Sequence, residues 1–465
     1  MRTTQVYHRT MWYAVLVLIG LFFNRPAVAQ TVAWDESTLR LIHANAGYGR
    51  MARTGQSEIV CCFDSGGKIW VRNSDDNGAS WQGPTLVADC SFGIATNPEI
   101  LKFANGDLLC SYNERPTDGI HPFSIMVSFS ENRGQKWTSP RRIYSADRRF
   151  ENGCWEPAAI QLAKGEVQLF FANENPYRGS DEQEITMLRS MDSGKTWDEP
   201  QKVSFRKSRR DGMPVPLVLS GNKGIVLAIE DNDFGEFKPA LVYTSSKDKW
   251  TKGFVDGGSA RRWPALKEPL PADVYAGAPY ICQMPSGETI LSIQSKEGGR
   301  TKPRMVVYVG DSWARGFANK SVPFGVPEST PCLWNSLFAK DKDTIIAISG
   351  TTLRGTSGLW SIEGRLIRQG AKSKSEVDIA QIWQHRVDGG PPQIHRFYAN
   401  GKINNPGGVA EWSIRGKELT MRWPSKKAPA GAWVDRCTLS PDRRSYTGTN
   451  QGGNKIAGEL SQSRD

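Results

Sequence analysis

The chain has 465 residues, with 59 Lys and Arg against 48 Asp and Glu, which gives a formal net charge of +11. Its five histidines never fall at His-x-x-x-His spacing and its eight cysteines never at Cys-x-x-Cys spacing, which argues against a zinc site and a Ser-His-Asp triad. No basic run with interleaved aromatic residues occurs, so nucleic acid is not an expected partner, and no metal or other cofactor is predicted.

The first 29 residues have the pattern of an export signal. Arg2 and Arg9 precede an apolar run from Met11 to Phe23, and Ala27-Val28-Ala29 suits cleavage before Gln30. The apolar run is too short to span a bilayer comfortably. Residues 1–29 are therefore predicted to be a signal peptide, which would leave a secreted or periplasmic protein without a membrane span. An uncleaved signal anchor is the alternative.

Three octapeptides of one pattern come next along the chain. Each reads Ser-x-(Asp/Asn)-x-Gly-x-x-Trp and is followed by a polar stretch that ends in Pro. The Ser hydroxyl and the Asp or Asn side chain can bond to turn amides, Gly supplies a positive φ, and Trp folds back over the hairpin. The predicted structural residues are Ser74, Asp76, Gly78, Trp81, Ser130, Asn132, Gly134, Trp137, Ser190, Asp192, Gly194 and Trp197.

The stretches around these octapeptides form a sixfold repeat. An apolar strand that opens with Pro and closes in Gly recurs, as from Pro98 to Gly106, and a second strand rich in β-formers follows it. The six second strands are expected at 58–63, 107–112, 166–171, 224–229, 288–293 and 344–349. The period of about 55 to 60 residues suits a four-stranded blade. The sequence therefore predicts an all-β fold with a six-bladed β-propeller over residues 30–368.

The residue composition changes after a polar hinge at residues 372–375. Residues 376–465 hold four tryptophans among Gly and Asn turns and are predicted to form a small separate β-domain. The tryptophans, which are Trp383, Trp412, Trp423 and Trp433, are expected in the core of this domain. Exposed rings that stack on sugars are the alternative.

The octapeptide resembles the Asp box of the sialidase superfamily, whose members are six-bladed β-propellers. In that family the box lies on the blade edge away from the active site. The resemblance therefore implies that the box residues are structural and that functional residues lie at the opposite end of the blades.

Polar residues are predicted to gather at that opposite end. In an antiparallel hairpin the start of the first strand and the end of the second lie together, so six hairpins place these ends on one rim. Glycoside cleavage needs two carboxyl groups facing across the scissile bond, and crowding acids beside Trp155 would split their pKa values. Glu156 and Glu230 are the predicted catalytic pair, with Glu174 as a third candidate. The residues predicted to bind substrate are Arg50, Trp155, Arg210, Asp211 and Tyr275.

Four rim segments look like the corresponding stretches of exo-acting α-L-arabinanases within the same superfamily. They are Cys154 to Pro157, Phe170 to Asn175, Arg210 to Met213, and Ile229 with Glu230. This resemblance implies that Glu156 and Glu230 are the nucleophile and acid/base of a retaining exo-glycosidase, in either order. The implied substrate is an oligosaccharide or polysaccharide with terminal arabinan-like sugars.

Other functions stay open at this point. An exo-α-sialidase would use rim arginines such as Arg50, Arg210 and Arg304 together with Tyr275, but the first strand shows Gly49-Arg50-Met51-Ala52 where that family has Arg-Ile-Pro. A non-catalytic glycan-binding propeller, or a C-terminal carbohydrate-binding module carried by the propeller, would also fit these features.

Overall fold

The computed structural model describes residues 30–233, 235–368, 381–398, 401–405, 408–415, 417–440 and 443–461. The predicted signal peptide and the predicted hinge lie outside these residues. The described chain divides into two compact units, one over Gln30–Ile367 and one that contains the strands after Arg368. No described segment forms an apolar helix of the length that a bilayer crossing needs.

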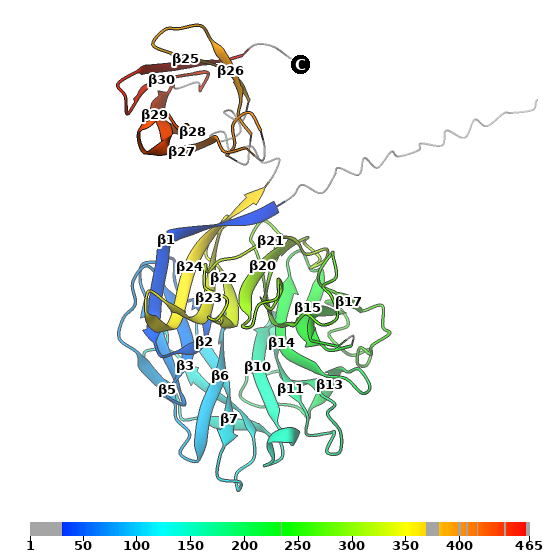
Figure 1. The fold of residues 1–465 in the computed structure, drawn as a ribbon. Helices are drawn as coiled ribbons and strands as arrows, with labels where there is room; N and C mark the ends of the chain where they lie inside the picture. Colours follow the sequence, from blue (N-terminus) through cyan, green and yellow to red (C-terminus); the bar gives the residue numbers. More distant parts are fainter. Residues whose placement is uncertain are drawn as a thin grey trace, which may run out of the picture. The chain divides into compact units, whose positions relative to one another are not determined.

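The first unit is a ring of six four-stranded antiparallel sheets, as the all-β prediction requires (Figure 1). Five sheets are formed by consecutive strands. They are β2 (Gly47–Arg53), β3 (Ile59–Ser65), β4 (Lys68–Ser74) and β5 (Thr85–Ala88); β6 (Gly93–Lys102), β7 (Leu108–Pro116), β8 (Ser124–Ser130) and β9 (Arg141–Ser145); β10 (Cys154–Gln161), β11 (Val167–Asn173), β12 (Glu184–Ser190) and β13 (Gln201–Ser204); β14 (Asp211–Leu219), β15 (Gly224–Asp231), β16 (Lys238–Thr244) and β17 (Arg262–Pro264); and β18 (Ala276–Gln283), β19 (Thr289–Ser295), β20 (Arg304–Gly310) and β21 (Ala318–Ser321).

The sixth sheet closes the ring with strands from both ends of the unit. It consists of β22 (Leu333–Ala339), β23 (Thr344–Leu353), β24 (Thr356–Arg368) and, as its outermost strand, the N-terminal β1 (Gln30–Ala44). The sequence did not reveal this closure, because β1 lacks the Pro and Gly marks of the repeat. Hydrogen bonds between the first and last strands of the unit, β1 and β24, hold the ring shut.

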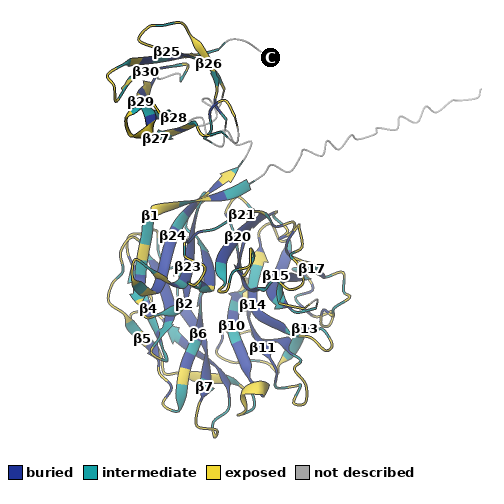
Figure 2. Cartoon of the chain, in the orientation of Figure 1, coloured by how far each residue is buried: buried dark blue, intermediate teal, exposed yellow. Residues whose placement is uncertain are grey.

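The first strand of each blade contacts the first strands of both neighbouring blades, so these six strands form the innermost layer. Figure 2 shows that most strand residues of the ring are buried, with exposed residues mainly in the connecting loops. All six predicted second strands are present as β3, β7, β11, β15, β19 and β23.

A β-bulge interrupts each of the six innermost strands near its start. The register shifts by one residue there, and one residue in each bulge has a positive φ. These residues are Tyr48, Asn97, Glu156, Met213, Ala278 and Trp334, with φ between 47° and 53°. The prolines that were expected to open four of these strands instead follow the bulge residue; β10, for example, begins at Cys154 and Pro157 comes after Glu156. Pro is tolerated there because the bulge leaves the amide ladder interrupted.

The three octapeptides form the turns between the third and fourth strands of the first three blades. In the third copy, the Ser190 hydroxyl accepts a bond from Gly194 N at 2.8 Å and donates to Asp192 at 2.8 Å. The other two copies repeat this geometry, and the three glycines have φ of 84° to 87°. Because Ser74 pairs with Ile59 at the start of β3, the turns lie at the end of the blades opposite the predicted rim.

The second unit is one seven-stranded sheet that curls round on itself (Figure 1). In spatial order its strands are β26 (Gln393–Arg396), β25 (Ile382–Val387), β31 (Lys455–Leu460), β30 (Ser445–Asn450), β29 (Ala432–Leu439), β28 (Glu418–Pro424) and β27 (Glu411–Arg415). Trp383 and Trp412 are buried in its core, as expected, whereas Trp423 and Trp433 are half-buried. All eight cysteines of the chain are free thiols.

Candidate active site

Glu156 is the bulge residue of the third blade, and the bulge determines where its carboxyl group lies. An extra residue in one strand re-aims the side chain at that point. The side chain of Asn113, at the end of β7 in the preceding blade, accepts a hydrogen bond from Glu156 N at 2.8 Å. The same arrangement recurs in two other blades, where Asp64 and Glu230 accept bonds from the bulge amides of Asn97 and Ala278. Each of these side chains ends a second strand, so the rim register that the sequence predicted is present.

Burial and neighbouring charges set the protonation of Glu156. Its side chain is 16% exposed, and the Arg115 guanidinium lies 3.8 Å from its Oε1. Its pKa is raised to about 7, chiefly by burial; the charges of Glu230 and Glu174 contribute to the rise, and Arg115 and Arg210 oppose it. Glu156 therefore keeps a proton near neutral pH that an ordinary glutamate would lose.

Glu230 ends β15 in the next blade and is held by a backbone donor. Ala278 N donates to its Oε2 at 2.7 Å, and burial raises its pKa to about 7 despite this bond and the charge of Arg210. A Cβ atom on Gly277 would come within 2.5 Å of Glu230 Oε2 and 2.8 Å of the Tyr275 hydroxyl. Glycine at position 277 thus leaves room for both groups, and they meet above its Cα.

Tyr275 is half-buried at this point, and its phenol stays protonated. Burial raises its pKa, and the nearby charges of Glu230, Glu236 and Glu156 raise it further. A neutral phenol beside Glu230 can donate a hydrogen bond to a carboxylate or to a sugar oxygen.

Glu174 is paired with Arg210 across the gap between β11 and β14. The Arg210 Nη2 bonds to Glu174 Oε1, and Gln183 Nε2 donates to the same oxygen at 3.2 Å. The charges of Glu174 and Arg210 both shift the pKa of Glu156, so Glu174 lies near the predicted catalytic pair. Glu174 therefore differs from Glu156 and Glu230 in that an arginine side chain donates a hydrogen bond to its carboxylate.

Trp155, the residue before Glu156, is only 6% exposed. Its ring packs edge-on against Phe123 at 5.1 Å and carries the Arg115 guanidinium 4.7 Å from its centroid. Arg115 also bonds to the side chain of Asn97. Trp155 therefore supports Arg115 beside Glu156, and the predicted contact with substrate stays a prediction.

Two other residues predicted to bind substrate are buried. Arg50 is 2% exposed; it pairs with Glu99 at 3.2 Å and donates to the carbonyls of Gly49 and Trp334. Asp211 is fully buried. Both side chains are held by partners within the protein, and their predicted contacts with substrate stay predictions.

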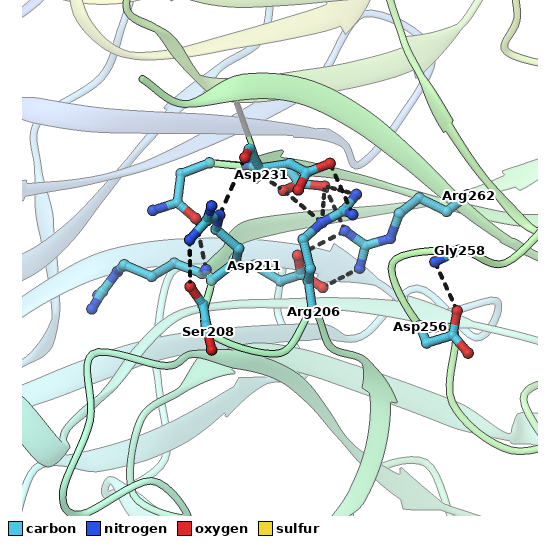
Figure 3. A network of polar contacts seen from close by, with 11 residues as sticks. Arg206, Ser208, Asp211, Asp231, Asp256, Gly258 and Arg262 are labelled. Carbon is cyan, nitrogen blue, oxygen red and sulfur yellow. Dashed lines mark hydrogen bonds and ion pairs between the residues drawn. The ribbon is translucent and has the colours of Figure 1, made fainter. Parts of the chain in front are cut away.

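Asp211 belongs to a buried network beside the candidate site (Figure 3). Arg262 Nη1 bonds to Asp211 at 2.9 Å and to Asp231 at 2.6 Å, and Arg206 adds a second bond to Asp231 at 2.9 Å. Asp211 follows Arg210 and Asp231 follows Glu230 in sequence, and the two aspartates are cross-strand partners. The network therefore fixes the backbone that carries Arg210 and Glu230.

Sequence reasoning placed Arg115 on the rim without a role and did not single out Asn113 or Gly277. Asn113 lies two residues before Arg115 near the end of β7, so a more exact alignment of the hairpin ends would have found it. Gly277 gives no such signal, since only the neighbouring side chains show why a Cβ is excluded. No group of three or more His, Cys, Asp or Glu side chains within the described ranges is arranged to hold a metal.

Fold and rim together define a six-bladed β-propeller with half-buried acids at one end of its innermost strands. A family model described as a BNR repeat-like domain matches residues 106–307, which agrees with the predicted recognition of the sialidase superfamily. No curated protein matches the sequence significantly.

Solved structures share the fold at low sequence identity. A protein of unknown function from Dyadobacter fermentans has a TM-score of 0.55 and 14% identity over 74% of this chain and 100% of its own. The Penicillium chrysogenum α-L-arabinanase, solved with arabinobiose, has a TM-score of 0.55 and 16% identity over 73% and 99%. The α-L-arabinofuranosidase of Fusarium graminearum, also solved with arabinobiose, has a TM-score of 0.53 and 15% identity over 70% and 94%. The chain thus shares its propeller fold with glycoside hydrolases.

Proposed function

We propose that the protein is an exo-acting glycoside hydrolase that removes terminal, arabinose-like sugars from an oligosaccharide or polysaccharide, with Glu156 and Glu230 as its catalytic pair. The observation that carries this proposal is that two half-buried glutamates from adjacent blades each have a pKa of about 7 and that the charge of Glu230 acts on Glu156. Because the charge on Glu230 raises the pKa of Glu156, the pair holds one proton over a range around neutral pH.

A singly protonated pair has the two chemical properties that glycoside cleavage needs. The protonated carboxyl donates its proton to the glycosidic oxygen as the bond to the leaving group breaks, and the ionised carboxylate attacks the anomeric carbon. Water then displaces the enzyme carboxylate and gives its proton to the first residue, which restores the starting state. We propose this retaining course, with the order of the two roles open. Anomeric configuration of the first-formed product, followed by NMR, distinguishes it from inversion.

The surroundings of the pair favour a neutral sugar over sialic acid. A sugar carboxylate would need converging arginines with free guanidinium groups. Arg50 is buried against Glu99, and Arg210 is bonded to Glu174. Two relatives in fold were solved with arabinobiose, a neutral disaccharide, which supports the same choice of substrate class.

The test uses Glu156→Gln and Glu230→Gln in the full chain, with Glu199→Gln, an exposed residue beyond the third octapeptide, as the control. Release of arabinose from arabino-oligosaccharides and from an aryl arabinofuranoside is expected to fall by about 10²–10⁴-fold in each rim variant and to stay unchanged in the control. Wild-type turnover in either rim variant would overturn the assignment. Release from sialyl-lactose alone would favour a sialidase, and binding without release would favour a glycan-binding propeller.

We further propose that residues 1–29 are a cleaved signal peptide, so that the propeller of residues 30–368 acts outside the cytoplasm or in the periplasm, together with the domain of residues 376–465. N-terminal sequencing of the mature protein is expected to start at Gln30. Deleting residues 371–465 is expected to leave cleavage of soluble substrates intact; loss of adherence to an insoluble polymer in that variant would make the second domain a binding module.

A further inference from the structure

A hollow of about 380 Å³ opens on the rim between the fifth and sixth blades. Tyr275 lines it next to Glu230, and Trp334 lines it from the sixth blade. Lys296 and Lys302 line it from the loop region after β19. The hollow therefore adjoins the candidate catalytic pair through Tyr275, which lies next to Glu230.

Gln294 lines this hollow and differs from its counterparts in other blades. It occupies the same register position as Asp64, Asn113 and Glu230, each of which accepts a bond from the bulge amide of the following blade. Gln294 makes no such bond to Trp334. It is only 1% exposed, and its Nε2 has no hydrogen-bond partner among the described residues. A buried amide donor without a partner is costly, so a ligand that offers an acceptor at this point would be favoured.

The charges around the hollow also favour a ligand that carries hydrogen-bond acceptors. Lys296 and Lys302 are exposed, and no ion pair is found for either ammonium group in the described part of the chain. Glu236 is the one acidic residue in the lining, against two lysines. The Trp334 side chain, 37% exposed with its ring centroid 5.9 Å from that of Tyr48, offers an apolar surface on which a sugar ring can lie.

We propose that this hollow binds a carboxylated sugar, a uronate unit of an acidic polysaccharide, next to the sugar that is cleaved. The lysine ammonium groups and the Gln294 amide are donors for its carboxylate, and Trp334 contacts the ring. The place of this subsite in catalysis rests on the proposed function, whereas its binding chemistry does not. The excess of basic residues over the whole chain would attract an acidic polymer in the same way.

The experiment compares binding of trigalacturonic acid and its methyl ester, in which each carboxylate is replaced by an uncharged ester, by isothermal titration calorimetry without turnover. The wild-type chain is expected to bind the acid about tenfold more tightly than the ester, since hydrogen bonds to charged groups contribute at least this much. In Lys296→Gln/Lys302→Gln the preference should disappear. The control Lys136→Gln/Lys195→Gln makes the same change of net charge at the octapeptide end and should keep it.

Equal binding of acid and ester by the wild type would overturn the proposal. Loss of the preference in the control variant would also overturn it, because the attraction would then come from net charge and not from the hollow. A wild type that prefers the acid but releases no sugar would support the subsite and reject the proposed hydrolase. Release of arabinose without acid preference would give the opposite result.

Discussion

The two ends of the same blades differ in how they treat polar groups. At the octapeptide end, hydrogen bonds made within a few residues hold the pKa values of Asp76 and Asp192 at about 2. At the rim, Glu156 and Glu230 are half-buried and their pKa values are about 7. Both ends belong to one scaffold, yet the polar groups of one end are satisfied locally and the acids of the other are partly removed from water.

The difference indicates where function is placed in this fold. Local hydrogen bonds stabilise a turn regardless of what surrounds it, whereas a buried acid in a bulge persists only because neighbouring blades hold it. Asn113, Ala278 and the Arg262 network supply that support from other strands. Four experiments would sharpen this contrast or remove it.

The largest expected effect comes from the buried network. Arg262→Met leaves Asp211 and Asp231 with less compensation, and breaking such a buried pair costs about 3–5 kcal/mol. Arg133→Met at the octapeptide end is the matched control, because its ion pair with Glu58 is 63% exposed on the arginine side and should matter by less than about 1 kcal/mol. Urea denaturation at pH 8 measures both, and equal losses would contradict the contrast.

Glu156→Gln should stabilise the protein at alkaline pH. The folded pKa of about 7 lies above the ordinary value of 4.5, so this group favours folding below pH 4.5 and loses that contribution as pH rises through 7. Removing the charge should add up to about 3 kcal/mol at pH 8 and little at pH 4.5, at about 1.4 kcal/mol per pKa unit. Glu199→Gln should show no such pH dependence. A Glu156→Gln variant no more stable at pH 8 than wild type would reject the buried, proton-holding carboxyl.

Activity should follow the titration of the rim pair and not that of the turns. With one carboxyl protonated and one ionised, kcat/KM should be greatest near pH 7 and fall about tenfold per pH unit well to either side. A profile from pH 4 to pH 10 on an aryl arabinofuranoside measures this. A constant rate between pH 5 and pH 9 would show that the pair does not carry the reaction.

The smallest expected effect lies in the turns. Ser190→Ala removes the hydroxyl that bonds Gly194 N and Asp192, which should cost about 1–2 kcal/mol with turnover per folded molecule unchanged. Ser139→Ala, at an exposed position, should change the stability by less than about 0.5 kcal/mol. Thermal unfolding and turnover are measured together, and a loss of turnover in Ser190→Ala would place function at the octapeptide end.

Hairpin positions were predictable because each hairpin is local. The period-two strands and Gly turns placed β3, β7, β11, β15, β19 and β23, and counting along the hairpins placed Glu156 and Glu230 at the same end. The prolines misled because a Pro after a bulge and a Pro that opens a strand look alike in sequence. The buried ion pairs of Arg50 and Asp211 could not be predicted, because their partners Glu99 and Arg262 are distant along the chain.

The sequence by itself determined the all-β repeat, its six hairpins, the octapeptide turns and the end of the blades on which the glutamates stand. These features depend on bonds between residues near one another in the chain. Only the tertiary structure decided that β1 closes the ring, that six bulges re-aim one residue per blade, and that Glu156 and Glu230 are half-buried and both have raised pKa values. Burial of the two glutamates and the charges of residues on neighbouring blades produce the raised pKa values. Neither is present before the blades assemble.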